Sequence, residues 1–234
     1  MNTGPENPNL GQFLAAVAAL EPLLDQVVFV GGCATGLLLT DPAAAPVRPT
    51  LDVDVIVEAA SYAGLVALEG ELRRLGFDQP RTEGTPVCRW VRGTLLVDFM
   101  PTDPAILGFS NRWYGPAMQQ ARRMQVGGKR IRLIAAPHFI ATKLEALQGR
   151  GREDYPMSHD LEDIISVVDG RPEIVEEVQF ANYDLRRYLS DEFRKLLSKR
   201  DFRDALPGHL LPDAASQQRL GIVVERLRSF ITED

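Results

Sequence analysis

The pattern of apolar and polar positions divides the 234-residue chain into a first part with strands and a second part that is almost wholly helical. Short apolar runs bounded by glycine or proline predict strands, and apolar residues spaced three or four apart predict helices. The predicted strands cover residues 27–30, 51–58, 87–91, 94–100, 123–126 and 129–134, the last four as two hairpins. Predicted helices cover residues 10–24, 33–39, 62–75 and 114–123.

In the second part, predicted helices cover residues 137–148, 158–169, 172–180, 184–200 and 214–231. Pro137 suits the first turn of its helix, and Ser158 suits an N-cap position. Strands followed by helices indicate an α/β protein with a mixed sheet and a helical C-terminal portion. We therefore expect an α/β core over residues 1–135 and a helical portion over residues 136–234.

Three acids interrupt strands that are otherwise apolar. Asp52 and Asp54 lie in the strand predicted at residues 51–58, and Asp98 lies in the strand predicted at residues 94–100. Because strand side chains alternate, Asp52 and Asp54 point the same way, about 7 Å apart along the strand. Like charges on one face are costly unless a cation lies between them, and a divalent metal ion that holds a nucleotide triphosphate is the commonest such cation. The alternative is a set of edge-strand acids that face water.

A Gly-Gly turn follows the first predicted strand. Gly31 and Gly32 stand where a strand gives way to a helix, and backbone N–H groups at such a turn can bind phosphate. An ordinary strand-to-helix turn uses the same residues, so the glycines alone do not decide between the two interpretations.

Charged residues on the helices predicted at residues 137–148 and 158–169 are a second set of candidates. Lys143 lies within the apolar stripe of its helix, so it either extends to the rim of the core or points into a site. Asp160 and Asp163 share one flank of the next helix. A negative charge near a helix N-terminus is favourable without any function, which explains Asp160 almost equally well.

Five segments occur in a fixed order along the chain. They are Gly31-Gly32-Cys33-Ala34, Arg48-Pro49-Thr50-Leu51-Asp52-Val53-Asp54, Asp98, Lys143 and Asp160-Leu161-Glu162-Asp163. Together they resemble the nucleotidyltransferase superfamily, and more closely its AbiEii/MenT-like branch of toxin nucleotidyltransferases. The resemblance covers roughly residues 25–170 and implies a polymerase-β-like core. Cys33 departs from the pattern, since many relatives carry Ser or Thr there, and this puts a hydroxyl contact to phosphate in doubt.

The resemblance implies a role for each candidate residue. The implied catalytic residues are Asp52, Asp54, Asp98, Lys143 and Asp160. The implied nucleotide-binding residues are Gly31, Gly32, Arg48, Thr50, Lys143 and Asp163. The implied ligands of Mg²⁺ or Mn²⁺ are Asp52, Asp54 and Asp98, the last either as a third ligand or as an aid to deprotonation of the acceptor. Arg150 and Arg152 are further candidates for phosphate contacts, although a surface role suits Arg152 better.

The implied function is that of an enzyme, a Mg²⁺-dependent nucleotidyltransferase that moves an NMP from an NTP to an acceptor hydroxyl. The implied acceptor is a tRNA 3′ end, and the implied biological role is the toxin of a toxin–antitoxin pair, with an antitoxin protein as partner. The alternatives are a small-molecule adenylyltransferase of the antibiotic-modifying type, a protein AMPylase, and a non-catalytic nucleotide-binding module.

Charge adds one local feature to a mildly acidic chain. The net charge of −6 argues against coating of nucleic acid in bulk. The segment 112–132 nevertheless holds six basic residues and no acid: Arg112, Arg122, Arg123, Lys129, Arg130 and Arg132. With Trp113 and Tyr114 as stacking surfaces, this stripe would suit an RNA 3′ end, and the alternative is a solvated hairpin. Acids interrupt the basic helix at residues 184–200, which we interpret as a solvated face.

Cysteine, histidine and hydropathy limit the remaining classes. Cys33 and Cys88 are too few for a disulfide framework, and three histidines without ligand spacing indicate no zinc site. No stretch is long and apolar enough to span a membrane, and the polar N-terminus does not resemble a signal peptide. We therefore expect a cytoplasmic protein with no membrane partner.

Overall fold

The computed structural model describes residues 7–58, 62–80, 82–107, 111–149 and 154–232. The chain divides into two compact units. The sheet unit contains Pro8–Ala34 and Pro49–Ala135, and the helical unit contains Met1–Asn7, Thr35–Arg48 and Ala136–Asp234.

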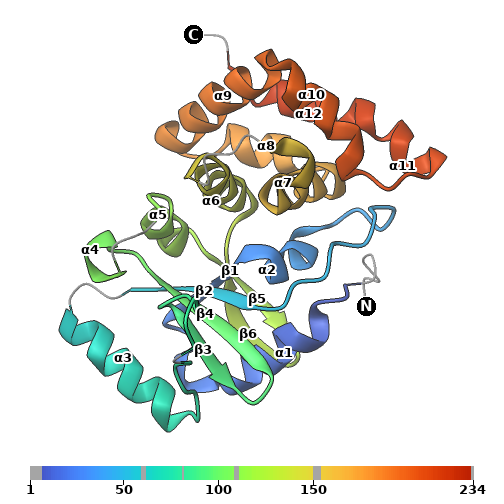
Figure 1. Ribbon diagram of the computed structural model, residues 1–234. Coiled ribbons are helices and arrows are strands. Elements are labelled where there is room, and N and C mark those ends of the chain that lie inside the picture. Colours follow the sequence, from blue (N-terminus) through green and yellow to red (C-terminus); the bar gives the residue numbers. More distant parts are fainter. Residues whose placement is uncertain (1–6, 59–61, 81, 108–110, 150–153, 233–234) are drawn as a thin grey trace. The chain divides into compact units, whose positions relative to one another are not determined.

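The sheet unit is built on a mixed six-stranded sheet (Figure 1). Its strands are β1 (Val27–Val30), β2 (Val53–Val57), β3 (Arg89–Arg92), β4 (Leu95–Pro101), β5 (Arg122–Val126) and β6 (Lys129–Leu133), in the order β3-β4-β2-β1-β6-β5. The β2–β4 and β1–β6 pairs are parallel, whereas the β1–β2, β3–β4 and β5–β6 pairs are antiparallel. All six predicted strands are present, and the predicted α/β class with a mixed sheet is confirmed.

Short helices accompany these strands. They are α1 (Leu10–Ala19), the 3-10 turn η1 (Glu21–Leu23), α2 (Gly31–Leu38), α3 (Tyr62–Arg74), α4 (Pro104–Leu107) and α5 (Tyr114–Gln119). The helix predicted at residues 10–24 is interrupted because Pro22 lacks the backbone N–H that an α-helix needs. The helix predicted at residues 114–123 is too long, since Arg122 already begins β5. The sequence pattern does not indicate α4, which is a single helical turn.

Side-chain alternation gives the sheet two different faces. Val53 and Val55 on β2 are at most 1% exposed, and Phe29 and Phe99 pair with Val55 from the neighbouring strands. Because paired residues point to the same side of a sheet, these residues form a continuous apolar face. Asp54 lies between the two valines and therefore points to the opposite face.

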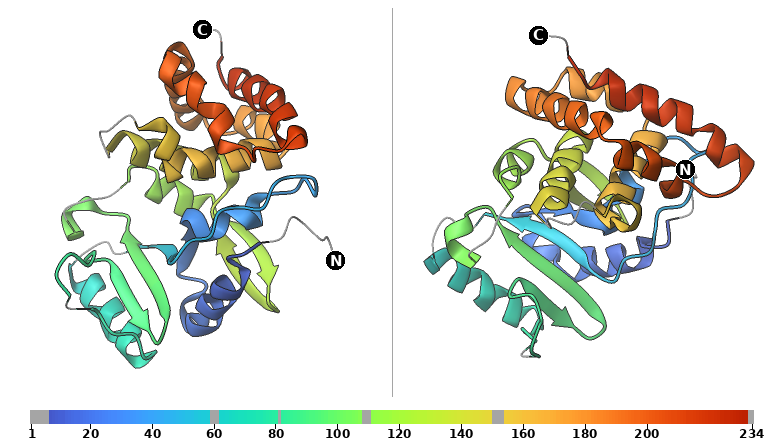
Figure 2. Two further views of the ribbon diagram at one scale, coloured as in Figure 1. Left: turned by 45° about the vertical axis from the view of Figure 1, so that its right-hand side comes forward. Right: turned by 45° about the horizontal axis from the view of Figure 1, so that its top comes forward.

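Two segments cover the apolar face of the sheet. From α1, Phe13 lies against Phe29 with ring centroids 4.8 Å apart. Just after α3, Phe77 meets the ring of Phe99 edge-on at 6.2 Å. Both α1 and α3 can be followed beside the sheet in Figure 2. The helices α1 and α3 do not cover the opposite face of the sheet, which carries Asp54.

The helical unit contains most of the remaining chain. Its elements are α6 (Ala136–Gly149), the 3-10 turn η2 (Tyr155–Met157), α7 (His159–Gly170), α8 (Ile174–Gln179), α9 (Tyr183–Ser198), α10 (Arg200–Ala205), the 3-10 turn η3 (Leu206–His209), α11 (Ala214–Gln218) and α12 (Leu220–Ser229). The predicted N-cap is confirmed, because Ser158 Oγ accepts from the Leu161 N–H. Within the part of the chain that the structure describes, none of the helices combines the length and apolar character that a membrane crossing requires.

Residues 35–48 pack with the helical unit although they lie between two strands in the sequence. The backbone N–H groups of Thr40 and Asp41 both donate to the carbonyl oxygen of Gly170 at 2.9 Å. The Asp41 carboxylate accepts from Arg219, which also binds Asp169. The boundary between the two units is therefore not a single cut after residue 135, because residues 35–48 belong to the helical unit.

Candidate functional site

One row of paired residues across four strands brings together candidate acids of the sheet unit. β1 places Val30 opposite Asp54, and β2 places Asp54 beside Asp98. β4 in turn places Asp98 opposite Arg89. These residues point away from the face that α1 and α3 cover, because paired residues share a face. Strand register thus sets two predicted acids side by side and adds a guanidinium.

Arg89 links Asp98 to Asp52, the third predicted acid. Its Nε and Nη2 atoms donate to Oδ1 and Oδ2 of Asp98, each at 2.8 Å, and Nη2 also donates to Asp52 Oδ2. Thr50 Oγ1 donates to the other oxygen of Asp52 at 3.0 Å. The side chains of Arg89 and Asp52 are 23% and 27% exposed, against 10% for Asp98. We call Asp52, Asp54, Asp98 and Arg89 the acid row.

The acid row shifts the protonation equilibria of its neighbours. Hydrogen bonds to Asp98 raise the pKa of the Arg89 guanidinium above its ordinary value, against the opposing effect of burial. Burial, followed by the Asp54 charge, raises the pKa of the Cys33 thiol to about 12. Burial, followed by the Asp98 charge, raises the pKa of Cys88 to about 12. At neutral pH Arg89 is charged and both thiols are protonated, so neither cysteine is a candidate nucleophile.

Gly31 has a structural reason to be glycine. It begins α2 with a φ angle of +69°, and a Cβ atom there would overlap the carboxylate of Asp54. Only glycine meets both conditions without strain. This close approach sets the Asp54 carboxylate at the start of α2, where the helix dipole favours negative charge. Phosphate binding by Gly31 and the neighbouring buried Gly32 stays a prediction.

The predicted residues of the helical unit form a second group of charges. Lys143 Nζ lies 3.2 Å from Asp160 Oδ1 and 2.7 Å from Asp163 Oδ2. Arg48 donates from Nε and Nη2 to the two oxygens of Asp163, at 3.1 and 3.0 Å. Its Nε also lies 3.9 Å from Glu162 Oε2. We call these five residues the helical ion cluster.

The carboxylates that bind Lys143 are more deeply buried than Asp52 and Asp98 of the acid row. The side chains of Asp163, Asp160 and Lys143 are 1%, 4% and 12% exposed. Burial lowers the pKa of Arg48, but the charge and hydrogen bonds of Asp163 outweigh it, so this pKa lies above its ordinary value. Lys143 thus points at two carboxylates instead of the rim of the core. Nucleotide binding by Lys143, Arg48 and Asp163, like catalysis by Asp160, stays a prediction.

The acid row does not fit a metal ion in the arrangement that the structure describes. Carboxylate oxygens are the ligands that Mg²⁺ and Mn²⁺ prefer. Both oxygens of Asp98 and one of Asp52 accept from Arg89, however, and the other oxygen of Asp52 accepts from Thr50. Among the described residues, no group of three or more His, Cys, Asp and Glu side chains is arranged to hold a metal ion. Metal binding by Asp52, Asp54 and Asp98 therefore requires Arg89 to move.

The basic residues of the segment 112–132 differ in their exposure to solvent. Lys129 forms an ion pair with Glu21, and Arg132 donates to the carbonyl oxygen of Asp25. The exposed side chains are those of Arg112, Arg122, Arg123 and Arg130. The ring of Trp113 is only 7% exposed, so the prediction that it offers a stacking surface is wrong.

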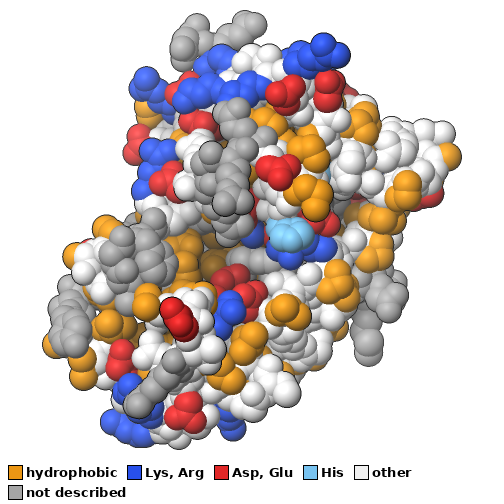
Figure 3. Space-filling view, in the orientation of Figure 1, with side chains coloured by type: hydrophobic (Ala, Val, Ile, Leu, Met, Phe, Trp, Pro, Cys, Tyr) orange, Lys and Arg blue, Asp and Glu red, His pale blue; other side chains and the backbone are white. Residues whose placement is uncertain are grey.

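Charge on α9 is balanced, as the interrupting acids of its sequence suggest. Arg194 and Arg187 lie near Asp191, and Lys195 lies near Glu192, each within one helical turn. Figure 3 shows basic and acidic side chains mixed over the helical unit on the face in view. Such exposed pairs contribute little to stability, which agrees with a solvated face.

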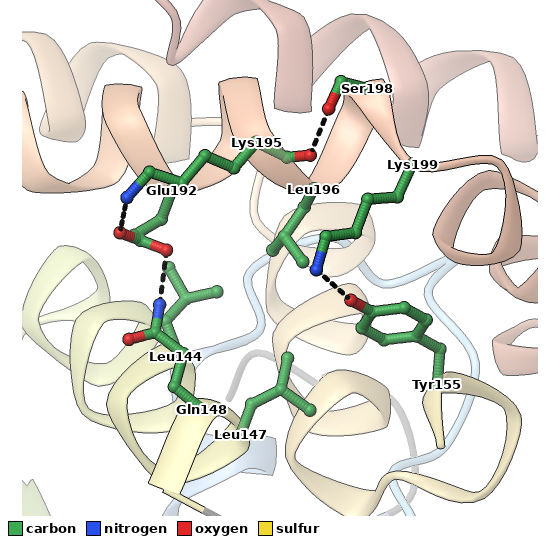
Figure 4. A pocket seen from close by; sticks show the side chains of 9 residues that line it. All are labelled: Leu144, Leu147, Gln148, Tyr155, Glu192, Lys195, Leu196, Ser198 and Lys199. Carbon is green, nitrogen blue, oxygen red and sulfur yellow. Dashed lines mark hydrogen bonds and ion pairs between the residues drawn. The ribbon is translucent and has the colours of Figure 1, made fainter. Parts of the chain in front are cut away.

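A separate cavity lies within the helical unit (Figure 4). Its volume is about 540 Å³, and it is lined by Leu144, Leu147, Gln148, Tyr155, Glu192, Lys195, Leu196, Ser198 and Lys199. Lys195 binds Glu192, and Lys199 donates to the Tyr155 hydroxyl, so the polar groups of its wall are turned toward one another. Of the predicted site residues that the structure describes, none lines this cavity. Arg150 and Arg152 lie outside the described residues.

Arg89 is the member of the acid row that the sequence patterns did not single out. The turn at Gly93-Thr94 pairs Arg92 with Leu95, and counting back along both strands pairs Arg89 with Asp98. Opposite charges directly across an antiparallel pair attract each other. The hairpin was predicted with its turn at Arg92-Gly93, which would set Arg89 opposite Leu96. The observed turn lies one residue later, and this difference in register is why the pairing with Asp98 was missed.

One solved structure similar to this chain is the crystal structure of an antigenic nucleotidyltransferase-like protein from Paracoccidioides brasiliensis. The two chains share 20% sequence identity and superpose with a TM-score of 0.50, over 85% of this chain and 93% of the other. No protein-family model and no curated protein sequence matches the chain. The chain therefore has a nucleotidyltransferase-like fold. The likeness shows the fold alone, and membership of the nucleotidyltransferase superfamily and of its AbiEii/MenT-like branch stays a prediction.

Proposed function

We propose that this protein is a nucleotidyltransferase that moves an NMP from an NTP to an acceptor hydroxyl. The observation that carries the proposal is the acid row, in which Asp54 and Asp98 stand side by side on parallel strands of a nucleotidyltransferase-like fold. Catalytic carboxylates must converge on one point from rigid elements, and a sheet holds them more firmly than loops do. An acid pair in this position has no use in the apolar packing of the sheet.

In this proposal the protein positions two reactants and accepts one proton. The acceptor oxygen approaches the α-phosphate in line with the leaving pyrophosphate, so both must be held in a fixed geometry. Asp54 or Asp98 accepts the proton of the attacking hydroxyl. Lys143 and Arg48 carry the cationic groups that the resemblance assigns to the phosphates. The reaction can depend on Mg²⁺ or Mn²⁺ only if Arg89 moves away from Asp52 and Asp98.

The finer part of the proposal concerns the acceptor and the biological role. It follows the resemblance in naming a tRNA 3′ end, with the enzyme acting as the toxin of a toxin–antitoxin pair. Support comes from the exposed arginines Arg122, Arg123 and Arg130 on the β5–β6 hairpin, because guanidinium groups attract a phosphate backbone. In the same proposal, Lys143 and Asp160 of the helical unit take the roles in the reaction that the resemblance implies for them.

The test is transfer of label from α-labelled ATP, CTP, GTP and UTP, each supplied separately with Mg²⁺ or Mn²⁺, to total tRNA and to whole-cell protein. Asp54→Ala should lower transfer about 1,000-fold or more, which corresponds to about 4 kcal/mol of transition-state stabilisation. Its thermal stability should be unchanged or raised, because the substitution relieves repulsion between carboxylates. Asp25→Ala removes the same charge from an exposed position of the sheet unit and should transfer normally.

The destination of the label separates the candidate functions. Label in tRNA that Asp54→Ala abolishes supports the toxin-type reaction and identifies the base. Label in protein assigns the acceptor to a side-chain hydroxyl. Wild-type transfer by Asp54→Ala contradicts the catalytic assignment. NTP binding without label in either pool favours a small-molecule acceptor or a non-catalytic module.

A further inference from the structure

A single nitrogen atom of Arg89 joins two of the three acids in the acid row. Its Nη2 donates both to Asp98 Oδ2, at 2.8 Å, and to Asp52 Oδ2. Two carboxylate oxygens, one from β4 and one from the residue that precedes β2, therefore converge on one cationic centre. A divalent cation shared by two carboxylates occupies the same kind of position between them.

The rest of the geometry holds the two acids in place independently of Arg89. Thr50 Oγ1 donates to the oxygen of Asp52 that Arg89 does not use. Asp98 belongs to β4, which lies between β2 and β3 in the sheet, so its backbone is fixed on both sides. If the guanidinium were withdrawn, the acids would still face the same point and would repel each other until another cation arrived.

Arg89 itself is placed where a long side chain can be withdrawn. It is the first residue of β3, and β3 is an edge strand of the sheet. Its side chain is 23% exposed, so part of the guanidinium already reaches solvent. Arginine has several rotatable bonds, and side-chain rotation needs no change in the strand.

We infer that Arg89 is the internal counter-ion of the acid row and competes with a divalent cation for Asp52 and Asp98. The inference rests on the proposed function, because the competing cation is the one that nucleotidyl transfer would use. In the arrangement described here, the acids are neutralised by a group of the chain itself. Asp52 and Asp98 would hold a divalent cation only after the Arg89 guanidinium has left them. The apparent affinity for the cation is lowered by the contacts that Arg89 must give up.

The experiment is Mn²⁺ binding to the intact protein without nucleotide, followed by the electron paramagnetic resonance signal of free Mn²⁺. Arg89→Gln keeps a polar side chain and removes the competing charge, so the dissociation constant for Mn²⁺ should fall about tenfold or more. Adding Asp98→Asn to Arg89→Gln should return the affinity to the wild-type value or below, because one of the two carboxylates is lost.

Arg92→Gln is the matched control on the same strand. Arg92 is exposed and pairs with Leu95, so its removal changes the net charge equally without touching the acid row. Its affinity for Mn²⁺ should stay within about twofold of the wild type, since exposed charges are screened by salt. Equal gains in Arg89→Gln and Arg92→Gln would show a general charge effect and overturn the inference. An unchanged affinity in folded Arg89→Gln would overturn it as well.

Two further measurements keep the inference testable where Arg89→Gln does not fold. Arg89→Lys retains the charge but loses the two-pronged contact with Asp98, so it should bind Mn²⁺ more tightly than the wild type. In the wild type, the NMR signal of the Arg89 Nε–H should shift during a Mg²⁺ titration with the midpoint of binding. A signal that stays unmoved while Mg²⁺ binds contradicts displacement, as does a Lys variant with unchanged affinity.

The readout separates this inference from the proposed function. Tighter Mn²⁺ binding by Arg89→Gln together with no nucleotidyl transfer to any acceptor retains the inference and rejects the function. Transfer by the wild type together with unchanged Mn²⁺ binding by Arg89→Gln retains the function and rejects the inference.

Discussion

The acid row and the helical ion cluster both place carboxylates against cationic side chains, but they differ in how accessible those groups are. In the acid row, Arg89 and Asp52 keep about a quarter of their side-chain surface exposed. In the helical ion cluster, Asp163 is 1% exposed and binds two cations at once. A buried charge that loses its partner is costly, whereas a half-exposed one is compensated by water.

This difference separates the groups that a ligand can reach from those that hold the fold. In the inference proposed above, the acid row exchanges its internal cation for an external one. Loss of Asp163 would leave Lys143 with Asp160 alone and Arg48 with the more distant Glu162. We therefore expect substitutions in the acid row to affect ligand binding first, and substitutions in the helical ion cluster to affect stability first.

The largest expected effect comes from breaking the helical ion cluster with Asp163→Asn. Because two cations lose their buried carboxylate, the free energy of unfolding should fall by about 3–5 kcal/mol. Asp98→Asn in the acid row should lower the free energy of unfolding by only about 1–2 kcal/mol, because Arg89 still binds Asp52 and is still partly hydrated. Asp191→Asn on α9, where the side chain is 43% exposed, should cost about 0.5 kcal/mol or less. Urea unfolding followed by circular dichroism measures all three, and equal losses at Asp163 and Asp98 would remove the contrast.

The next effect tests how tightly the acid row is packed. Gly31→Ala introduces a Cβ into the carboxylate of Asp54 at a positive φ, so the free energy of unfolding should fall by about 3 kcal/mol. Gly128→Ala shares a positive φ of +78° but meets no atom within 4 Å. It should lose only about 1 kcal/mol, the cost of the backbone conformation. Thermal unfolding of both variants measures this difference. Similar losses of stability in the two variants would mean that the Asp54 side chain can move away from the new Cβ at little cost.

The smallest effect concerns a buried titratable group of the helical unit, His138. His138 is 5% exposed, and neither ring nitrogen has a hydrogen-bond partner among the described residues. Burial lowers its pKa to about 4, so the folded chain keeps the ring neutral where the unfolded chain takes up a proton. Stability from this group is complete above pH 6.5 and is lost as the pH falls toward 4. His138→Leu should flatten the loss between pH 7 and pH 4 by about 2–3 kcal/mol.

His159→Leu is the control for this pH dependence. The His159 side chain is 67% exposed, so its replacement should leave the curve of unfolding free energy against pH close to that of the wild type. Urea unfolding at a series of pH values provides both curves. Parallel curves for His138→Leu and the wild type would mean that His138 does not contribute to acid instability.

The sheet and its acids were predictable because their signals are local. The alternation of valine and aspartate within β2 predicts which side chains share a face of the sheet, and the Gly-Gly pair predicts where β1 ends. The register of the β3–β4 hairpin is local too, but its turn was predicted one residue early, at Arg92-Gly93, so the contact between Arg89 and Asp98 was missed. Pro22 and the start of β5 explain why two predicted helices were too long.

The helical ion cluster was only partly predictable because its contacts span long distances in sequence. The spacing of Asp160 and Asp163 on one helix is a local feature, and both do reach Lys143. Arg48, however, lies 115 residues before Asp163, and no periodicity links them. The same applies to Asp41 and Arg219, 178 residues apart, which help to place residues 35–48 with the helices. Such pairings depend on the whole fold and not on any short pattern.

The two-residue turn at Gly93-Thr94 also limits how this chain can change in length. A residue inserted between Trp90 and the turn would move Arg89 to the apolar face and bring Trp90 among the acids, unless a bulge absorbed it. An insertion in the loop at residues 82–88 would leave the pairing unchanged. Homologues that keep the counter-ion should therefore tolerate insertions and deletions before β3 and reject them within it.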